Sequence, residues 1–125
     1  MSANGIIQAA TVIAKTTQTA VGAVLGTSGA DVLNIYVNYV KGDETGVDVI
    51  VSFQRTATGT AHPQALWSEA GGVYTLEAQK YRFAASGNAV IPVNVEAIDF
   101  VKITQGGSNN DGTPTGTLAV SYSME

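Results

Sequence analysis

The sequence predicts an all-β protein, an antiparallel β-sandwich of the jelly-roll type with an extended N-terminal segment. Three observations predict this fold class. Several runs of residues alternate between faces and are rich in valine, isoleucine, threonine and tyrosine. Turn-forming residues separate these runs at short intervals, and no amphipathic helical pattern of ordinary length occurs, which disfavours a βαβ fold. An immunoglobulin-like sandwich is the second choice.

The N-terminal segment has one charged side chain in its first thirty residues, Lys15. Residues 6–13 are fairly apolar on both faces, as in a strand that is covered on each side. A helix over residues 9–24 is the competing interpretation, but threonine and glycine there favour strand. We expect two strands or an arm over residues 1–27, followed by the sandwich of residues 28–125 in a single domain. The candidate assembly interface consists of Ile6, Ile7, Val12, Ile13, Val21, Val24 and Leu25.

Residues 31–56 give the clearest strand pattern. One face of the first run carries Leu33, Ile35, Val37 and Tyr39, and one face of the second carries Val47, Val49, Val51 and Phe53. The connection over residues 41–46 contains two glycines and most of the local charge, so we expect it to be solvated. The pattern predicts one long β-hairpin.

The middle of the chain predicts a loop and two short strands. Residues 57–65 are a loop by composition, and Pro63 cannot donate a ladder hydrogen bond. Gly71 and Gly72 break the chain before a strand-like run at residues 73–78. Residues 80–84 alternate again and predict a further strand.

The C-terminal third predicts three more strands. Residues 86–88 form a turn, and Pro92 restricts the run at 90–95 to a sheet edge or a strand end. Residues 98–104 and 117–124 predict the last two strands, with the long Gly/Asn loop of 106–116 between them. The predicted core consists of Leu33, Ile35, Val37, Val49, Val51, Phe53, Phe100, Ile103, Leu118 and Val120.

Composition limits the classes of function. The chain of 125 residues fits one domain and contains no cysteine, so disulfides and thiolate metal sites are excluded. Its net charge is −4 and its six basic residues are scattered, which argues against nucleic acid as a partner. We expect neither a signal peptide nor a transmembrane helix. Only 13% of residues are charged, about half the usual share, and burial against neighbouring chains is one way to tolerate such a surface.

Catalytic groups are scarce. His62 is the only histidine, and nothing in the spacing pairs it with a nucleophile and a carboxylate. The carboxylates of Asp43, Glu44 and Asp48 are close in sequence, but a solvated charge cluster explains them more simply than paired glycosidase acids. We therefore expect no enzymatic site and no cofactor.

Two ligand classes have candidate residues. Calcium could be bound by the acids at 43, 44 and 48 or by Asn109, Asn110 and Asp111, although neither set has EF-hand spacing. A glycan could stack on aromatic rings, for which Trp67 and Tyr74 are the candidate platform and Tyr81 is a third ring. A lone tryptophan is more often a core or interface residue, so we prefer that role for Trp67.

The segment IYVNYVKGDETGVDVIVSFQ resembles a segment of small virion-associated proteins of tailed bacteriophages. The resemblance extends to the C-terminal loop that leads into Thr-Pro-Thr-Gly-Thr-Leu and a final strand. It covers residues 31–56 and 101–122, about half of the chain, and not the N-terminal segment.

This resemblance implies a non-enzymatic structural protein of the virion, made in the host cytoplasm. A capsid decoration (cement) protein is the first expectation, and a neck or tail component or a carbohydrate- or receptor-binding module is the alternative. The implied partners are further copies of the chain and other virion proteins such as the major capsid protein. We expect residues 6–25 to be the main assembly element, because long apolar strands have edges that pair with other chains.

Overall fold

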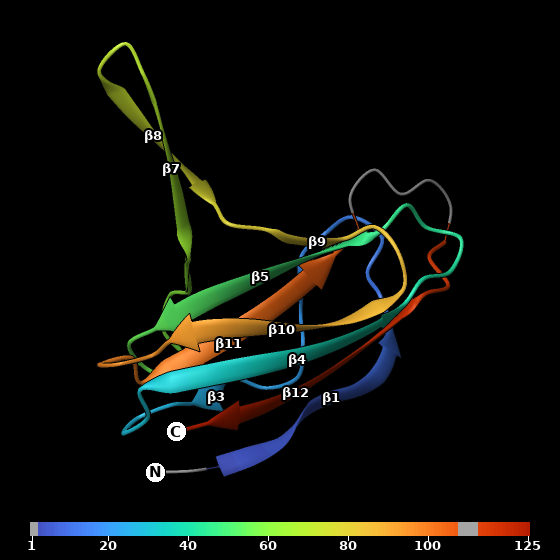
Figure 1. Ribbon diagram of the computed structural model, residues 1–125, viewed down its shortest axis with the longest axis horizontal. Coiled ribbons are helices and arrows are strands. Elements are labelled where there is room, and N and C mark those ends of the chain that lie inside the picture. Colours follow the sequence, from blue (N-terminus) through green and yellow to red (C-terminus); the bar gives the residue numbers. More distant parts are fainter. Residues whose placement is uncertain (1–2, 108–112) are drawn as a thin grey trace.

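The computed structural model describes residues 3–107 and 113–125, and these residues form two packed antiparallel sheets and a separate hairpin (Figure 1). The predicted all-β sandwich is confirmed. Among the described residues there is no helix of the length and apolarity needed to cross a membrane.

The first sheet has four strands and the second has six. The four-stranded sheet has the order β1 (Ala3–Val12), β12 (Thr117–Met124), β4 (Val32–Val40) and β10 (Gly87–Asn94). In the six-stranded sheet, β2 (Thr19–Ala20) and β3 (Leu25–Gly26) pair with β11 (Phe100–Gly106). Strand β11 pairs with β5 (Val47–Gln54), whose other edge is shared by β6 (His62–Pro63) and β9 (Tyr81–Phe83). The separate hairpin consists of β7 (Ala65–Ala70) and β8 (Val73–Ala78).

This topology is that of a jelly roll. Strands β2 and β3 together occupy the second position of the fold, and β6 and β9 occupy the fifth, with the β7–β8 hairpin inserted between them. With that grouping, the sheet orders are 1-8-3-6 and 2-7-4-5, the arrangement produced by two Greek keys.

The predicted hairpin of residues 31–56 is wrong, although both of its strands exist. Strand β4 pairs with β10 and β12, whereas β5 pairs with β6, β9 and β11 in the other sheet. The connection between them crosses from one sheet to the other. A period-2 pattern identifies a half-buried strand but does not identify its partner, and residues 41–46 are long enough for either connection.

The core lies between the sheets and contains the inward-facing residues that the alternation predicted. Eight of the ten predicted core residues are buried, while Phe53 and Phe100 are partly exposed. The structure adds further buried side chains that the prediction did not include: Ile13, Val21, Ala30, Tyr39, Val47, Ile91, Val93, Val95, Val101 and Met124.

The connection over residues 41–46 is not fully solvated, because the side chain of its own Glu44 is buried. Its carboxylate accepts a hydrogen bond from the Tyr39 hydroxyl and others from the backbone N–H groups of Gly42, Thr115 and Gly116. Burial raises the pKa of this carboxyl, but the hydrogen bonds outweigh burial and lower the pKa to about 2. Burial and the contact with Glu44 raise the pKa of Tyr39.

The expected solvated cluster of acids is therefore also wrong. Glu44 and Asp48 are 3% and 7% exposed, and Asp48 pairs with Arg82 at 3.3 Å. Only Asp43 of the three remains exposed. Glu44 links the connection between β4 and β5 to Thr115 and Gly116, which immediately precede β12. Its role in the described structure is therefore to join segments that are distant in the sequence.

The N-terminal segment is built into both sheets. Strand β1 pairs with β12, and β2 and β3 pair with β11. The backbone N–H of Val21 donates to the Ile103 carbonyl at 2.8 Å. Within the described part of the chain, strand β10 pairs only with β4, so Pro92 lies in an edge strand, as its missing N–H predicted.

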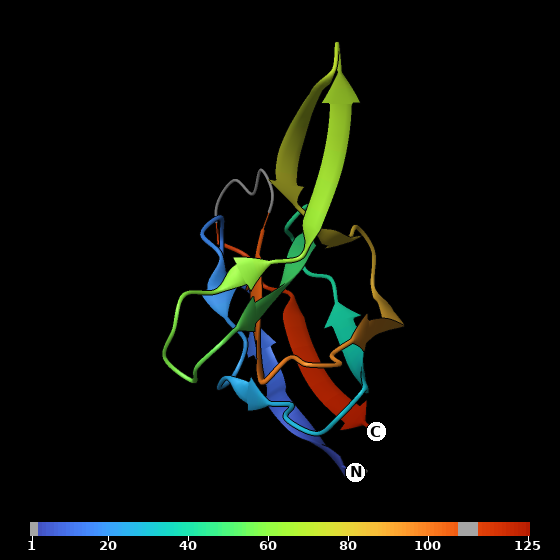
Figure 2. The same cartoon turned by 90° about the vertical axis from the view of Figure 1, so that its left-hand side faces the viewer.

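The β7–β8 hairpin projects away from the sandwich, and Figures 1 and 2 show it standing clear of both sheets. Its base is closed by a hydrogen bond of 2.8 Å from the Gln79 N–H to the Gln64 carbonyl. Both hairpin strands are exposed along almost their full length.

Candidate interaction surfaces

The hairpin presents large apolar side chains on both of its faces. Direct cross-strand partners lie on the same face of a sheet, so Trp67, Tyr74 and Leu76 share one face. Leu66 and Val73 lie on the other. These five side chains are between 54% and 71% exposed, and clustered exposed apolar side chains of this kind mark interaction sites.

The turn of the hairpin has the geometry that two-residue β-turns prefer. Gly71 and Gly72 have φ angles of +59° and +80°, as in a type I′ turn, which glycine adopts without strain. The carboxylate of Glu69 accepts the Gly72 N–H at 2.6 Å. The chain therefore specifies a regular hairpin here even though the sandwich does not cover it.

The second exposed apolar surface is the outer face of the four-stranded sheet. None of its four strands contains Asp, Glu, Lys or Arg, so every charged side chain of the protein lies elsewhere. We call this outer surface the uncharged face. Its large apolar members are between 41% and 77% exposed: Ile6, Val12, Val32, Tyr36, Val40 and Val90. The other sheet differs: on its strand β5, the outward-facing Ile50 and Ser52 alternate with the core residues and are only 8% and 4% exposed.

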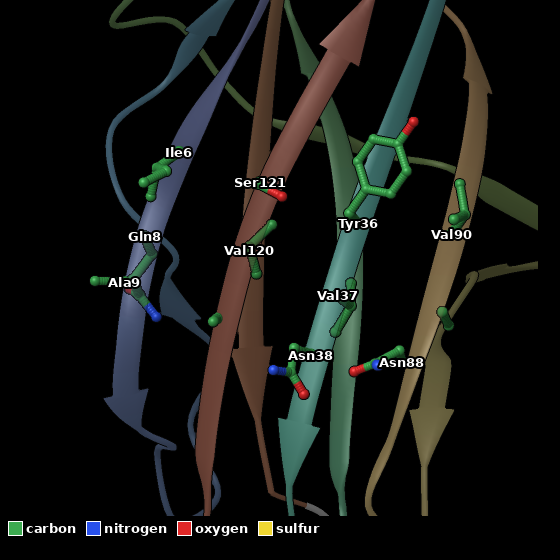
Figure 3. Close-up of a pocket in the computed structure, with 12 residues that line it drawn as sticks. Ile6, Gln8, Ala9, Tyr36, Val37, Asn38, Asn88, Val90, Val120 and Ser121 are labelled. Atoms are coloured by element: carbon green, nitrogen blue, oxygen red, sulfur yellow. The ribbon is translucent and has the colours of Figure 1, made fainter.

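The register aligns the uncharged face into rows that cross the sheet. Ile6 lies opposite Ser121, Ser121 opposite Tyr36, and Tyr36 opposite Val90, which forms one row over four strands. The small residues of β12 lie in a groove of about 560 Å³ that residues of all four strands line. Figure 3 shows Ile6 and Tyr36 on the strands at either side of β12.

The seven predicted assembly residues occupy different environments. Ile13 and Val21 are buried in the core, so they are not available to another chain. Ile7, Val24 and Leu25 are partly buried, whereas Val12 is 53% exposed. Ile6 is 77% exposed and borders the groove, so the second apolar face of β1 is left uncovered by the described chain.

The structure brings together two of the three aromatic rings that the sequence singled out. Trp67 and Tyr74 are on the same face of the hairpin and are 62% and 71% exposed, so Trp67 is not a core residue. Tyr81 lies apart in β9, where its hydroxyl donates to Gln64 at 3.0 Å.

The remaining candidates do not form a reactive cluster in the described part of the chain. His62 lies in β6 beside a polar cavity of about 340 Å³ that Arg55 and Asp99 also line. No group of three or more His, Asp or Glu side chains suited to a metal occurs within residues 3–107 and 113–125. The calcium candidates Asn109, Asn110 and Asp111 lie outside the described residues.

The comparisons with known proteins bear on the fold. No family model matches the sequence, and no curated protein matches it either. The chain is similar in structure to the SPBc2 prophage-derived protein YomS, with a TM-score of 0.55 and 10% identity over 99% of this chain and 92% of that one. At this identity the likeness establishes the shared fold alone.

Two other solved structures have TM-scores below 0.5. One belongs to Bacillus endospore appendages, described as disulfide-linked pili, with a TM-score of 0.48 and 15% identity over 99% of this chain and 86% of that one. The other is from infectious bursal disease virus strain Gx, with a TM-score of 0.47 and 12% identity over 98% of this chain and 32% of that one. Neither likeness carries an argument about function.

Proposed function

We propose that this protein is a non-enzymatic structural component of a tailed-bacteriophage virion, and specifically a capsid decoration protein that stabilises the particle through protein–protein contacts. The observation that carries the proposal is the exposed β7–β8 hairpin. It is a regular element with large apolar side chains on both faces and no covering from its own sandwich.

We expect a hairpin with these exposed side chains to bind an external partner. An isolated two-stranded hairpin is only marginally stable in water, and full burial of one large apolar side chain contributes about 1.5 to 3 kcal/mol. Trp67, Tyr74 and Leu76 on one face could therefore contribute several kcal/mol on docking. A groove on a neighbouring virion protein, such as the major capsid protein, is the partner that the proposal assigns to this face.

The fold and the sequence resemblance support the same proposal. A jelly roll with a short inserted hairpin offers a rigid body and one projecting contact element. The structural likeness to a prophage-derived protein and the resemblance of residues 31–56 to virion-associated phage proteins agree with a phage origin.

The test is binding to particles that were assembled without this protein. We expect the purified wild type to bind them saturably and to raise the temperature at which they release DNA. A triple variant Trp67→Ala, Tyr74→Ala, Leu76→Ala should lose both effects. The double variant Leu66→Ala, Val73→Ala tests the other face of the hairpin in the same two measurements. The proposal fails if the wild type does not bind, or if both variants bind like the wild type.

Deletion of residues 1–27 is a poor test of assembly, because it removes three strands together with Ile13 and Val21 from the core. The variant Ile6→Ala is better, since this side chain is exposed and its loss leaves the core intact.

A neck or tail role would appear as few copies at one vertex or along the tail when the bound protein is labelled with gold, whereas decoration predicts many copies over the capsid.

A carbohydrate- or receptor-binding module is the second candidate function. The observation that favours it is the shared exposed face of Trp67 and Tyr74, since aromatic rings on one surface can stack against a sugar. Specific binding on a glycan array that is abolished by Trp67→Ala would move this function ahead. An array without signal, together with particle binding, supports decoration.

A further inference from the structure

We propose that the uncharged face is the interface of a two-fold dimer, in which a second copy of this chain packs the same face against it. The outer sides of β1, β12, β4 and β10 meet their own equivalents. This inference concerns the free protein, and it stands or falls separately from the role in a virion.

The absence of charge favours a second copy as the partner. In a two-fold interface the same patch lies on both sides, so a charged residue near the axis meets its own equivalent and is repelled. A different protein could supply the opposite charge, so a face that binds one can keep charged residues more readily than a face that binds its own copy. All four strands of this sheet nevertheless lack charged residues, whereas β5, β7, β8, β9 and β11 each contain one.

The polar groups of the face are also suited to pairing with themselves. Its rows contain the amides of Asn34, Asn38 and Asn88 and the hydroxyls of Ser121 and Ser123. Amides and hydroxyls each both donate and accept hydrogen bonds, so two identical copies can satisfy one another. A face that carried donors alone or acceptors alone would leave buried groups unpaired against its own copy.

The shape of the face is self-complementary in the same sense. The outward residues of β12 are small, and they form the floor of the groove between Ile6 on β1 and Tyr36 on β4 (Figure 3). Tyr36 and Val90 also line this groove, and they are the large side chains on the β4 and β10 side of the small residues of β12. Rotation by 180° about an axis in the interface, parallel to the strands and between β12 and β4, places Tyr36 of each copy over the small β12 residues of the other.

The available area meets the requirement for a specific dimer. Four strands of about eight residues cover about 19 Å by 27 Å, which is about 500 Å² on each copy and about 1,000 Å² in total. This area assumes that the whole face is covered, and the roughness of the side chains adds to it. Specific interfaces begin at about 1,000 Å² in total.

The test is the mass of the free wild-type protein and of Asn38→Asp, measured by light scattering over a range of concentrations. We expect the wild type to form a discrete dimer. The substitution is nearly isosteric at an exposed position, but it puts a carboxylate into the interface of both copies, so the dissociation constant should rise at least about tenfold at pH 7. Ala119 and Asn88 are its cross-strand neighbours and do not titrate.

Protonation provides an internal check on Asn38→Asp. At about pH 4 the introduced carboxyl is largely neutral, because desolvation in the dimer raises its pKa, and dimerisation should return. The matched control is Ser68→Asp, which adds the same charge to an exposed strand of the hairpin and should leave the mass unchanged. A wild type that stays monomeric, a trimer, or a dimer that Asn38→Asp leaves unaltered would each overturn the proposal.

Discussion

Glu44 joins two segments of the sandwich that are far apart in the sequence, residues 39–44 and residues 115–116. Each of its two carboxylate oxygens accepts two hydrogen bonds: Oε2 from Tyr39 and Gly42, and Oε1 from Thr115 and Gly116. Gly116 has to be glycine here, because a Cβ at this position would overlap with the Glu44 carboxylate. The buried charge is stabilised because four donors replace the water that it loses.

Replacement of Glu44 by Gln should lower the free energy of unfolding by about 3 kcal/mol at pH 7. The pKa of Glu44 is about 2 in the folded protein against an ordinary 4.5, so the folded state favours the charged form. The wild type should have this stabilisation in full above pH 4.5 and lose it as the pH falls towards 2. Urea unfolding at a series of pH values measures it, and Glu44→Gln should show a smaller loss over this range.

Tyr39→Phe separates the hydroxyl from the backbone donors. Glu44 keeps its three backbone hydrogen bonds, so this variant should lose only about 1 to 2 kcal/mol. The pKa of Glu44 should rise without the Tyr39 donor. The decline in stability should begin near pH 4.5 as in the wild type, but it should be smaller and end at a higher pH. If Tyr39→Phe has the same pH profile as the wild type, the hydroxyl does not contribute to the low pKa.

The sequence could predict the core residues but not this carboxylate. The alternation in β4 and β12 assigned Leu33, Ile35, Leu118 and Val120 to the interior, because burial on one face of a strand has a period of two. Glu44 lies in a charged connection, where an exposed side chain is the ordinary case. Its partners at 115 and 116 are distant in sequence, so no local pattern announces that they meet.

At the scale of elements, the β7–β8 hairpin is the part of the chain that the sandwich needs least. None of its residues belongs to the buried core, and its two ends are already joined by the hydrogen bond between Gln79 and Gln64. The sequence predicted the strand at 73–78 and the break at Gly71 and Gly72. It could not predict that the hairpin projects, because projection depends on what the rest of the fold leaves uncovered.

Replacement of residues 65–78 by a short Gly-Ser linker should therefore leave the sandwich folded. We expect the melting temperature to change by less than about 3 °C, which for a domain of this size corresponds to about 1 kcal/mol or less. Calorimetry measures the change, and loss of particle binding in the same variant would assign binding to the hairpin. A large fall in melting temperature would mean that the hairpin supports β6 and β9.

At the scale of the whole molecule, the charged residues are distributed unequally between the two sheets. The four-stranded sheet has none, and the sixteen charged side chains lie in the other strands, the connections and the C-terminal residue. The individual uncharged segments are visible in the sequence. Their assembly into one face is not, because β1 and β12 come from opposite ends of the chain and β4 and β10 from the middle.

This division of charge predicts how the dimer responds to salt. Each copy has a net charge of −4, so two copies repel one another at long range, while the interface itself contains no ion pair that salt could weaken. Salt screens the repulsion, and the Debye length falls from about 10 Å at 0.1 M to about 3 Å at 1 M. The Kd of the wild-type dimer should therefore stay constant or fall as NaCl rises from about 50 mM to about 500 mM, and sulfate should lower it further because it strengthens apolar burial.

Sedimentation velocity at each salt concentration gives this Kd directly. Ser68→Asp should follow the wild type, because its added charge lies outside the interface. A Kd that rises steeply with salt would mean that ion pairs hold the two copies together. Association would then have to use the charged sheet or the connections, since β1, β4, β10 and β12 contain no ions to form such pairs.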